Sequence, residues 1–467
     1  MTSQAKALVF AACIAMFPLC GFSPDSTARV SDDFIVTAAP AYQPLAALHG
    51  QERFPRGAQL LLVHQGKSEP LLVEFAATAD GNVSFDGERV LFAGKKDASG
   101  PWQVWELTLA DKSLRQLTSG KEDAIRPLYL PNGRFVYAQR TPAGFQLRAE
   151  PRGESEGAEK VHAEVDVTAM QLTHADASAI PVDVLADGRI LFESGFPLGS
   201  GATPELYLVY SDGSGVESYR CDHGTARWGG TQLASGDVVF THGTSLARFT
   251  SPLAHEERIA APHAEYAGAI AETKSGEWLV SAKLAAEKNY EIKVWKLGES
   301  TLQTVLSESG NELVEPVPIA PRVTPKRHPS GLHPWDYANL LALDARVSRD
   351  GALKGVPATV RVEQRDAEGH AVALGAAPIE SDGSYFVKVP GDKPIRFVVL
   401  DARGSILRQE HGWFWARGGE QRICVGCHAG PERASENRVP AVLLRTTTPV
   451  DLTGPAAANQ TAFVGGR

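Results

Sequence analysis

The feature that most constrains the fold is a turn that recurs along residues 55–320. Each turn is a dipeptide followed at once by a short apolar run, and successive turns lie 40 to 55 residues apart. The five turns are Asp86-Gly87, Asn132-Gly133, Asp187-Gly188, Ser235-Gly236 and Ser275-Gly276. This spacing is the period of a β-propeller blade, and alternating apolar residues are typical of a half-buried strand. The repeat therefore predicts a mainly β chain built on a propeller rather than a helical fold.

Five recognisable blades leave room for a sixth. The segments 59–63 and 315–321, at the two ends of the repeat, are strand-like and are expected to share that blade. Such a closure would cover the sheet edges that an open array leaves exposed. We therefore expect a six-bladed propeller over residues 45–322.

A second β region follows the propeller. Residues 323–336 are rich in Pro and His and predict an ordered linker, since Pro removes backbone donors and disfavours helix. Strand-like runs at 358–363, 384–389 and 395–400 are separated by turn residues. They predict a small β-sandwich over residues 337–410. It is followed over residues 411–467 by a segment that carries Cys424, Cys427 and His428 and by a C-terminal tail.

The chain begins with an export signal at residues 1–30. Lys6 precedes an apolar run from Ala7 to Met16. Two processing routes stay open, namely lipid attachment at Cys20 and ordinary cleavage near Ala28. No other stretch is apolar and uncharged for long enough to span a bilayer, so we expect a mature protein without an integral membrane span, in the periplasm or another extracytoplasmic space. The net charge of -9 argues against nucleic acid as a partner.

One short motif indicates that the chain binds a cofactor. Cys424-Val425-Gly426-Cys427-His428 has the C-x-x-C-H pattern of covalent haem c attachment. Two thiols on one turn are able to add to the two vinyl groups on one porphyrin edge, and His428 then becomes the proximal iron ligand. The alternatives are a thioredoxin-like pair, a zinc site and coincidence. Because haem c attachment requires export, the signal supports a single covalent haem. Cys221 has no evident partner and is interpreted as a lone buried thiol.

Two families resemble parts of this chain. Ser84-Phe-Asp-Gly87 and Tyr210-Ser-Asp-Gly-Ser-Gly215 resemble the motifs of TolB-like six-bladed propellers. The segment 381–428, ending Gly-Glu420-Gln-Arg422-Ile-Cys-Val-Gly-Cys-His428, resembles the middle domain of the hydrazine synthase alpha subunit and its relatives. In that group a TolB-like propeller precedes a β domain ending in G-E-x-R-x-C-x-G-C-H. Glu420 and Arg422 would then bind a haem propionate or each other, unless they form a plain surface ion pair.

The sixth haem ligand would decide the function. Met170 is the only methionine beyond the signal, and His411 lies just upstream of the motif. Other histidines that remain available are His223, His242, His328 and His333. The resembling family also suggests a tyrosine ligand or an open face. Trp413, with Phe414 and Trp415, either packs on the porphyrin or fills the sandwich core. His223-Gly224 and Arg227-Trp228 are expected near the propeller channel, as a substrate pocket or a structural turn.

Three functions remain possible. The preferred one is an exported mono-haem c-type cytochrome that transfers electrons or assists a redox complex, with the propeller as a docking platform for a redox partner protein. The second is a haem enzyme of the hydrazine synthase alpha-like group, acting on a small nitrogen or oxygen species at an open iron. The third is a binding or scaffold subunit whose haem is structural. The family's alpha subunit carries two haem motifs and this chain has one, which argues against hydrazine synthesis itself.

Overall fold

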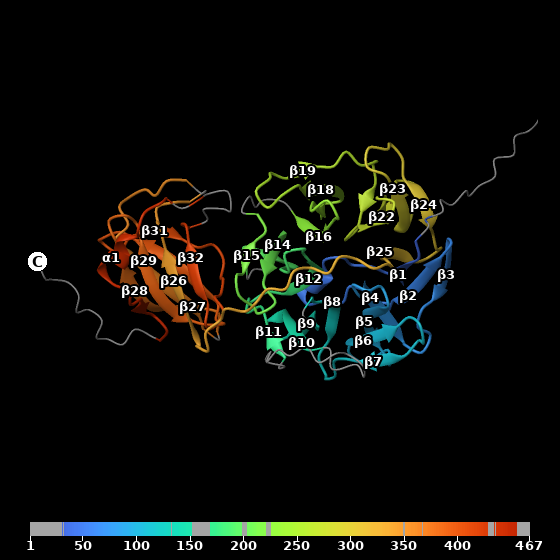
Figure 1. Cartoon of the computed structure of the whole chain (residues 1–467), viewed down its shortest axis with the longest axis horizontal. Coiled ribbons are helices and arrows are strands. Elements are labelled where there is room, and N and C mark those ends of the chain that lie inside the picture. The colour runs from blue at the N-terminus through green and yellow to red at the C-terminus, as the bar shows by residue number, and fades with distance from the viewer. Residues whose placement is uncertain are drawn as a thin grey trace, which may run out of the picture.

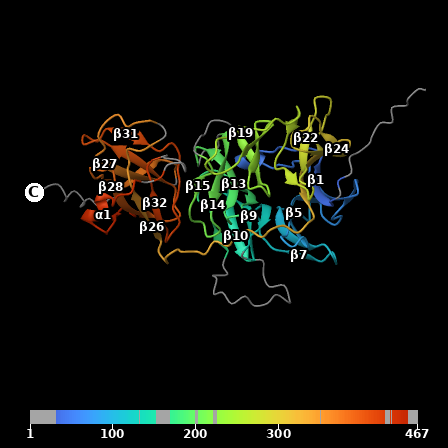
Figure 2. The same cartoon turned by 45° about the horizontal axis from the view of Figure 1, so that its top comes forward.

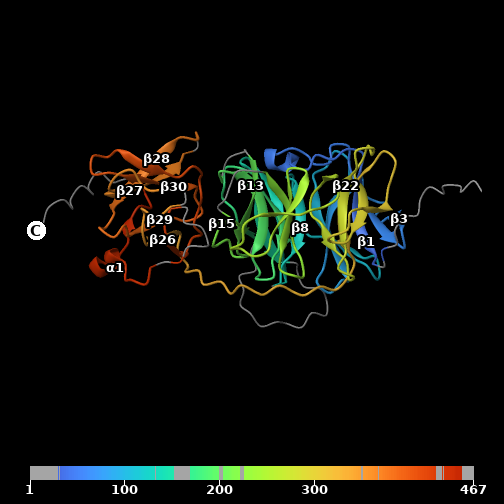
Figure 3. The same cartoon turned by 90° about the horizontal axis from the view of Figure 1, so that it is seen from above.

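The computed structural model describes residues 30, 32–131, 133–151, 169–198, 203–220, 226–348, 351–366, 368–427, 434 and 436–454. Apart from Val30, the predicted signal peptide lies outside these residues, as do Cys20, Cys221, His223 and His428. The described chain forms two β bodies that lie side by side in all three views (Figure 1, Figure 2, Figure 3). Within these residues, no helix is long and apolar enough to cross a membrane.

The larger body is a ring of six antiparallel sheets, which confirms the predicted six-bladed propeller. From the innermost strand outward, three of the sheets are β25 (Glu312–Pro318), β1 (Phe34–Ala39), β2 (Gln59–His64), β3 (Lys67–Pro70); β4 (Ala77–Val83), β5 (Arg89–Lys95), β6 (Gln103–Thr108), β7 (Leu114–Gln116); and β8 (Ala124–Tyr129), β9 (Arg134–Thr141), β10 (Gly144–Pro151), β11 (Met170–Gln171). The other three are β12 (Ala179–Val184), β13 (Ile190–Phe196), β14 (Thr203–Val209), β15 (Glu217–Ser218); β16 (Arg227–Gln232), β17 (Val238–His242), β18 (Ser245–Phe249), β19 (Glu257–Arg258); and β20 (Glu265–Tyr266) with β21 (Ala271–Glu272), β22 (Trp278–Lys283), β23 (Glu291–Trp295), β24 (Gln303–Leu306). The innermost strands surround the centre of the ring in Figure 1.

The recurring turns of the sequence each join the innermost strand of a blade to its second strand. Their glycines all have positive φ, between 75° and 93°, a conformation that only glycine adopts freely. Two of these turns also lie against the chain that leads to the second body, one just before the linker and one within it. A Cβ at Gly87 would lie 2.9 Å from the nitrogen of Pro321, and one at Gly188 would lie 2.2 Å from the oxygen of Lys326. The linker therefore runs across the turns of the blades before it reaches the second body.

The ring is closed by strands from its two ends. β25 pairs with β1, so the last strand of the propeller becomes the innermost strand of the blade that the first strands build. This confirms that segments 59–63 and 315–321 share a blade. The predicted start at residue 45 was too late, because β1 at Phe34–Ala39 is part of the ring. Every residue of β1 is buried, so it lacks the alternation that marks a half-buried strand.

The smaller body is a sandwich of two four-stranded sheets. One sheet has the order β32 (Gln421–Cys424), β26 (Tyr337–Ala342), β29 (Tyr385–Pro390), β33 (Val450–Asp451), and the other β28 (Ala371–Pro378), β27 (Thr359–Arg365), β30 (Ile395–Leu400), β31 (Ile406–Gln409). The boundary at residue 410 needs correction, since β32 and β33 complete the first sheet in parallel pairings with β26 and β29. These strands are only four and two residues long and show too little alternation to be predicted. The residues that the structure describes also include two short helices, η1 (Ala46–His49) and α1 (Ala441–Arg445).

Candidate haem-attachment site

Cys424 is the last residue of β32, an edge strand of the sandwich. In the parallel pairing with β26, Arg422 lies opposite Leu340 and Cys424 opposite Ala342, and both partners belong to the buried core. Gln421 and Ile423 alternate with them and are exposed, Ile423 to 66%. Because successive side chains of a strand point to opposite faces, Arg422 and Cys424 share the inward face. The Cys424 carbonyl also accepts a 2.9 Å hydrogen bond from the Leu343 amide, which fixes the strand end.

Cys427 follows on a tight turn and is buried in the sandwich core, where it packs in one cluster with Tyr385 and Phe397. Gly426 makes this turn possible. A Cβ there would lie 2.7 Å from both the Cβ and the carbonyl oxygen of Val347, closer than real contacts allow. The glycine of the C-x-G-C-H motif therefore has a packing reason. It lets the loop lie against residues 344–347 and directs the second thiol inward.

The surroundings keep both thiols protonated. Burial raises the pKa of Cys424, and the guanidinium of Arg422 opposes that rise. Burial, with a contribution from the Glu410 carboxylate, raises the pKa of Cys427 to about 12. A thioredoxin-like nucleophile needs a lowered thiol pKa, so this environment argues against that alternative. The described residues also contain no group of three or more His, Cys, Asp or Glu arranged for a metal ion.

A pocket lies beside the turn that joins the two cysteines. Leu343, Val347, Val425 and Pro440 form an apolar wall, and Asp344, Glu436 and Arg438 add charged groups. Ile423 and Val439, 66% and 62% exposed, flank the pocket residues in sequence. Two free thiols on one turn beside an apolar surface form the kind of donor set to which a porphyrin edge is joined. The described residues therefore fit a covalently held haem. Because Cys427 is buried, the turn would have to open for its thiol to reach the porphyrin edge.

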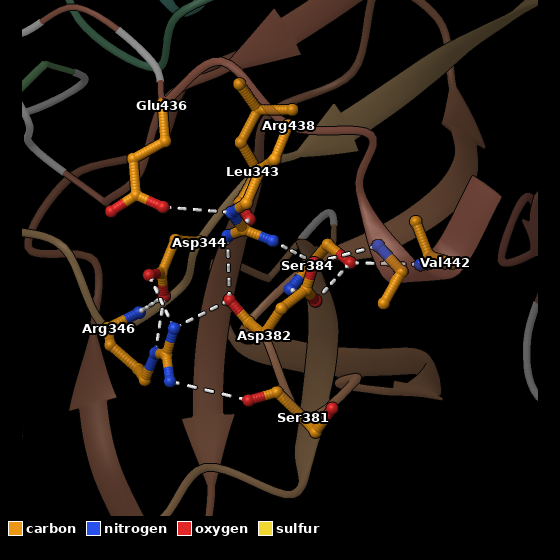
Figure 4. A network of polar contacts seen from close by, with 10 residues as sticks. Leu343, Asp344, Arg346, Ser381, Asp382, Ser384, Glu436, Arg438 and Val442 are labelled. Carbon is orange, nitrogen blue, oxygen red and sulfur yellow. Dashed lines mark hydrogen bonds and ion pairs between the residues drawn. The ribbon is translucent and has the colours of Figure 1, made fainter. Parts of the chain in front are cut away.

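A polar network fixes the chain beyond the motif (Figure 4). Arg438 forms an ion pair with Asp382 and donates to the Leu343 carbonyl. Asp382 also accepts from the Ala441 amide at 2.8 Å and from the Ser384 hydroxyl at 2.6 Å. Although burial acts to raise it, these hydrogen bonds bring the pKa of Asp382 down to about 2. Both ends of the loop that carries Cys427 are thus held against the same sheet.

Glu420 and Arg422 join the attachment strand to the propeller. The buried Glu420 carboxylate accepts from the Gly215 amide at 3.2 Å and from the Arg417 amide at 2.8 Å. Arg422 donates to the Val216 carbonyl at 2.7 Å, and its Nη1 lies 3.8 Å from Glu420. Gly215 and Val216 belong to the loop before β15, on which the TolB-like motif was recognised. The sequence offered three partners for these two residues: a haem propionate, each other, or a plain ion pair at the surface. The ion pair between them is observed, and it is largely buried. Their observed contacts form a seam between the two bodies.

The aromatic run before the motif also packs at this seam. Trp413 is buried between the guanidinium groups of Arg365 and Arg396, 5.0 and 4.6 Å from its ring centre, and its amide donates to the Leu198 carbonyl. Trp415 is completely buried in a propeller cluster. These contacts explain why both tryptophans are buried, and neither needs a porphyrin to pack against.

The predicted sixth ligands lie in several places. His411 is exposed, and Met170 is half-buried in β11 against the cluster that contains Trp415. His328 stacks on Tyr210, His333 stacks on Trp335, and His242 is held by Glu256 and Arg258. The identity of this ligand stays a prediction.

Sequence reasoning missed Arg408 and Tyr385. Arg408 donates to the Gly351 carbonyl, and its Nη1 is buried without a hydrogen bond. Its charge acts on the Cys427 thiol, and both thiols act on Tyr385. Only the pairing of distant strands brings these residues together, so no local signal could have found them.

Comparisons with known proteins agree with this arrangement. The model of the hydrazine synthase alpha subunit middle domain matches residues 363–429, which include the whole C-x-x-C-H motif. Hydrazine synthase from Kuenenia stuttgartiensis is similar in structure, with a TM-score of 0.75 at 18% identity over 89% of this chain and 72% of that chain. TolB from Acinetobacter baumannii gives a TM-score of 0.44 at 12% identity, over 63% of this chain and 67% of that chain. No curated protein is similar in sequence. The predicted resemblance to the hydrazine synthase alpha group is confirmed.

Proposed function

We propose that the protein is an exported mono-haem c-type cytochrome related to the hydrazine synthase alpha subunit, acting in electron transfer or as a redox accessory subunit. One observation carries this proposal. The turn from Cys424 to Cys427 lies at the edge of the sandwich, and the C-x-x-C-H motif to which it belongs falls inside the segment that matches the family's middle domain. Cys424 and Cys427 would hold the haem through thioethers, and His428 would bind its iron. A bound haem supplies a one-electron couple between ferric and ferrous iron.

The chain's own residues orient the attachment turn. Gly426 keeps the turn close to residues 344–347, while Arg438 and Asp382 hold the returning chain. Glu420 and Arg422 tie β32 to the propeller loop, which supports the propeller as a docking platform rather than an independent domain. The family model describes a subunit, and this supports a partner protein in the same complex. The periplasm is the proposed location, because haem c attachment takes place after export.

The test is to express the chain with its own signal in a bacterium that matures c-type cytochromes. We expect a periplasmic protein that keeps its haem after denaturation. The variants Cys424→Ala and Cys427→Ala should each lose a thioether, whereas Cys221→Ala should retain both. A periplasmic protein that is fully folded without covalent haem would overturn the proposal.

A second candidate, a haem enzyme with an open iron, is supported by the placement of the two residues proposed as sixth ligand. His411 is exposed, and Met170 is packed on a propeller strand. The absorption spectrum of reduced protein with carbon monoxide separates the two functions. An α band that carbon monoxide does not change supports electron transfer, and a shifted band supports the enzyme. If both bodies and a partner complex survive in Cys427→Ala, this result favours the binding or scaffold subunit over both redox functions.

A further inference from the structure

The centre of the propeller contains charged residues in an unusual backbone conformation. Asp80 on β4, Arg126 on β8 and Glu315 on β25 have φ values of 60°, 55° and 59°. Each lies at a bulge on an innermost strand, where the pairing with the neighbouring strand shifts register. A left-handed conformation costs a residue with a side chain roughly 1–3 kcal/mol, and such residues concentrate at functional sites. At the bulge of β16 the corresponding residue is Gly229.

These side chains meet in one buried network. Arg53 forms ion pairs with Asp80 and Glu315, and Arg126 forms an ion pair with the same oxygen of Glu315. The other oxygen, Oε2, is buried and has no hydrogen-bond partner. A buried acceptor without a donor is rare in a folded protein. Glu315 is 9% exposed and lines a pocket in the channel.

The pocket has aromatic walls and a second acid. Tyr42, Trp228 and Glu193 line it together with Glu315. A Cβ built on Gly268 would lie 3.7 Å from the Tyr42 hydroxyl, 3.9 Å from Trp228 Cζ3 and 4.0 Å from Glu315 Cγ. Gly268 therefore leaves open a small space on which both rings and the Glu315 side chain converge. Glu193 is held by a 2.5 Å hydrogen bond from the Gly229 amide.

The charges of this set do not cancel. Two arginines, Arg53 and Arg126, face three acids, Asp80, Glu193 and Glu315, so full ionisation leaves one negative charge in a buried space. Burial raises the pKa of Glu193, while Arg126 and Arg53 act against the rise. The charge is thus relieved by a proton on Glu193 or by one bound monovalent cation. No three His, Cys, Asp or Glu residues in the described part of the chain are arranged to hold a metal.

We propose that the propeller channel binds a small organic ammonium ion, with its N–H groups donating to Glu315 Oε2 and Glu193 and its carbon portion against Trp228 and Tyr42. Carboxylates with aromatic faces are the usual recognition chemistry for alkylated ammonium groups. Arg126, Trp228 and Glu315 lie on the innermost strands β8, β16 and β25, so the site belongs to the propeller and does not depend on the proposed haem.

Methylammonium chloride is the probe, titrated into the full-length protein against sodium chloride of equal ionic strength. Calorimetry and tryptophan fluorescence should both show one saturable site that sodium does not fill. Glu193→Gln keeps the acceptor for the Gly229 amide but removes the charge, and it should weaken binding by about tenfold or more. Trp228→Leu should weaken it roughly tenfold as well. Glu69→Gln, an exposed glutamate on β3, is the matched control and should bind as the wild type does.

Proton release gives an independent readout. Binding should displace the Glu193 proton, so affinity should rise with pH and the measured heat should depend on the ionisation enthalpy of the buffer. The Glu193→Gln variant should show neither effect. Absence of saturable binding, equal binding of sodium, or undiminished binding by Glu193→Gln would each overturn the proposal. Glu315→Gln is a secondary variant, and if it fails to fold, Glu193→Gln and Trp228→Leu still decide.

Discussion

At the scale of single residues, the sequence shows which side chains are able to bind a cofactor more readily than which residues they contact. Cys424, Cys427 and His428 are recognisable because the spacing of two thiols and an imidazole is itself the chemical requirement. The partners of Glu420 and Arg422 could not be predicted, because Gly215 and Val216 lie 205 and 206 residues away in the chain. Local pattern carries no information about contacts at that separation.

Replacing Gly426 tests the packing of the attachment turn. In Gly426→Ala the new methyl group would meet Val347 at 2.7 Å, so either the turn or residues 344–347 must shift. We expect a loss of about 1–3 kcal/mol in the free energy of unfolding and a lower yield of covalent haem. Urea unfolding and haem stoichiometry measure the two effects. Gly331→Ala is the control, because a Cβ at Gly331 meets nothing within 4 Å; equal behaviour of the two variants would contradict this explanation.

Asp382 makes the sandwich sensitive to acid. Its folded pKa of about 2 lies below the unfolded value of 3.8, so its stabilisation is complete above pH 4 and disappears as pH falls from there to about 2. We expect Asp382→Asn to cost about 1 kcal/mol at pH 7, because solvent screens part of its interaction with Arg438. The wild type and the variant should become equally stable near pH 2, as followed by urea unfolding across this pH range. Asp336→Asn, an exposed substitution, should leave the profile unchanged. A difference that is independent of pH would contradict the role given to the carboxylate.

At the scale of elements, a strand could be predicted from the sequence where it is long enough to show a clear pattern of apolar residues. The five turns between first and second blade strands were found because they need glycine at positive φ. The strands β27, β29 and β30 were found because they are six or seven residues long and rich in β-branched residues. β1 is buried throughout, and β32 and β33 are short, so a search for alternation misses them.

The closing pair of strands should limit the stability of the ring. Leu313 on β25 is completely buried in a cluster with Phe34 and Val36 of β1. Leu313→Ala should cost about 2–5 kcal/mol and increase hydrogen exchange in β1 before the other blades open. Leu297→Ala, at a position that is 50% exposed, should change stability little. Uniform exchange across all blades in Leu313→Ala would show that closure is not the weak point.

At the scale of the whole molecule, the two bodies meet through a polar seam. Arg365 pairs with Asp176 at 2.8 Å, and Arg417 pairs with Asp392, which lies 3.4 Å from the propeller residue His174. Together with Glu420 and Arg422, these contacts hold the attachment strand against one blade. The sequence predicted both bodies and the linker. It did not predict that the residues beside the haem motif would join the two bodies.

Removing the buried carboxylate should open this seam. In Glu420→Ala the amides of Gly215 and Arg417 lose their acceptor, which should cost about 1–3 kcal/mol. Hydrogen exchange at Gly215 should rise while both β bodies stay folded, and small-angle scattering should show a more extended particle. Glu69→Ala serves as the exposed control. If the Gly215 amide remains as protected as in the wild type, the seam does not depend on Glu420.

The closure of the ring also sets the order in which the protein is completed. β1 precedes every other described strand, yet its inner neighbour β25 follows 23 further strands along the chain. During synthesis the inner edge of β1 therefore waits for a partner until residue 318 has emerged. An unpaired apolar edge is a template for wrong pairing, and pairings of such long sequence separation form slowly. The growing chain thus needs protection from aggregation until nearly the whole propeller has been made, and the sandwich acquires its neighbour only afterwards.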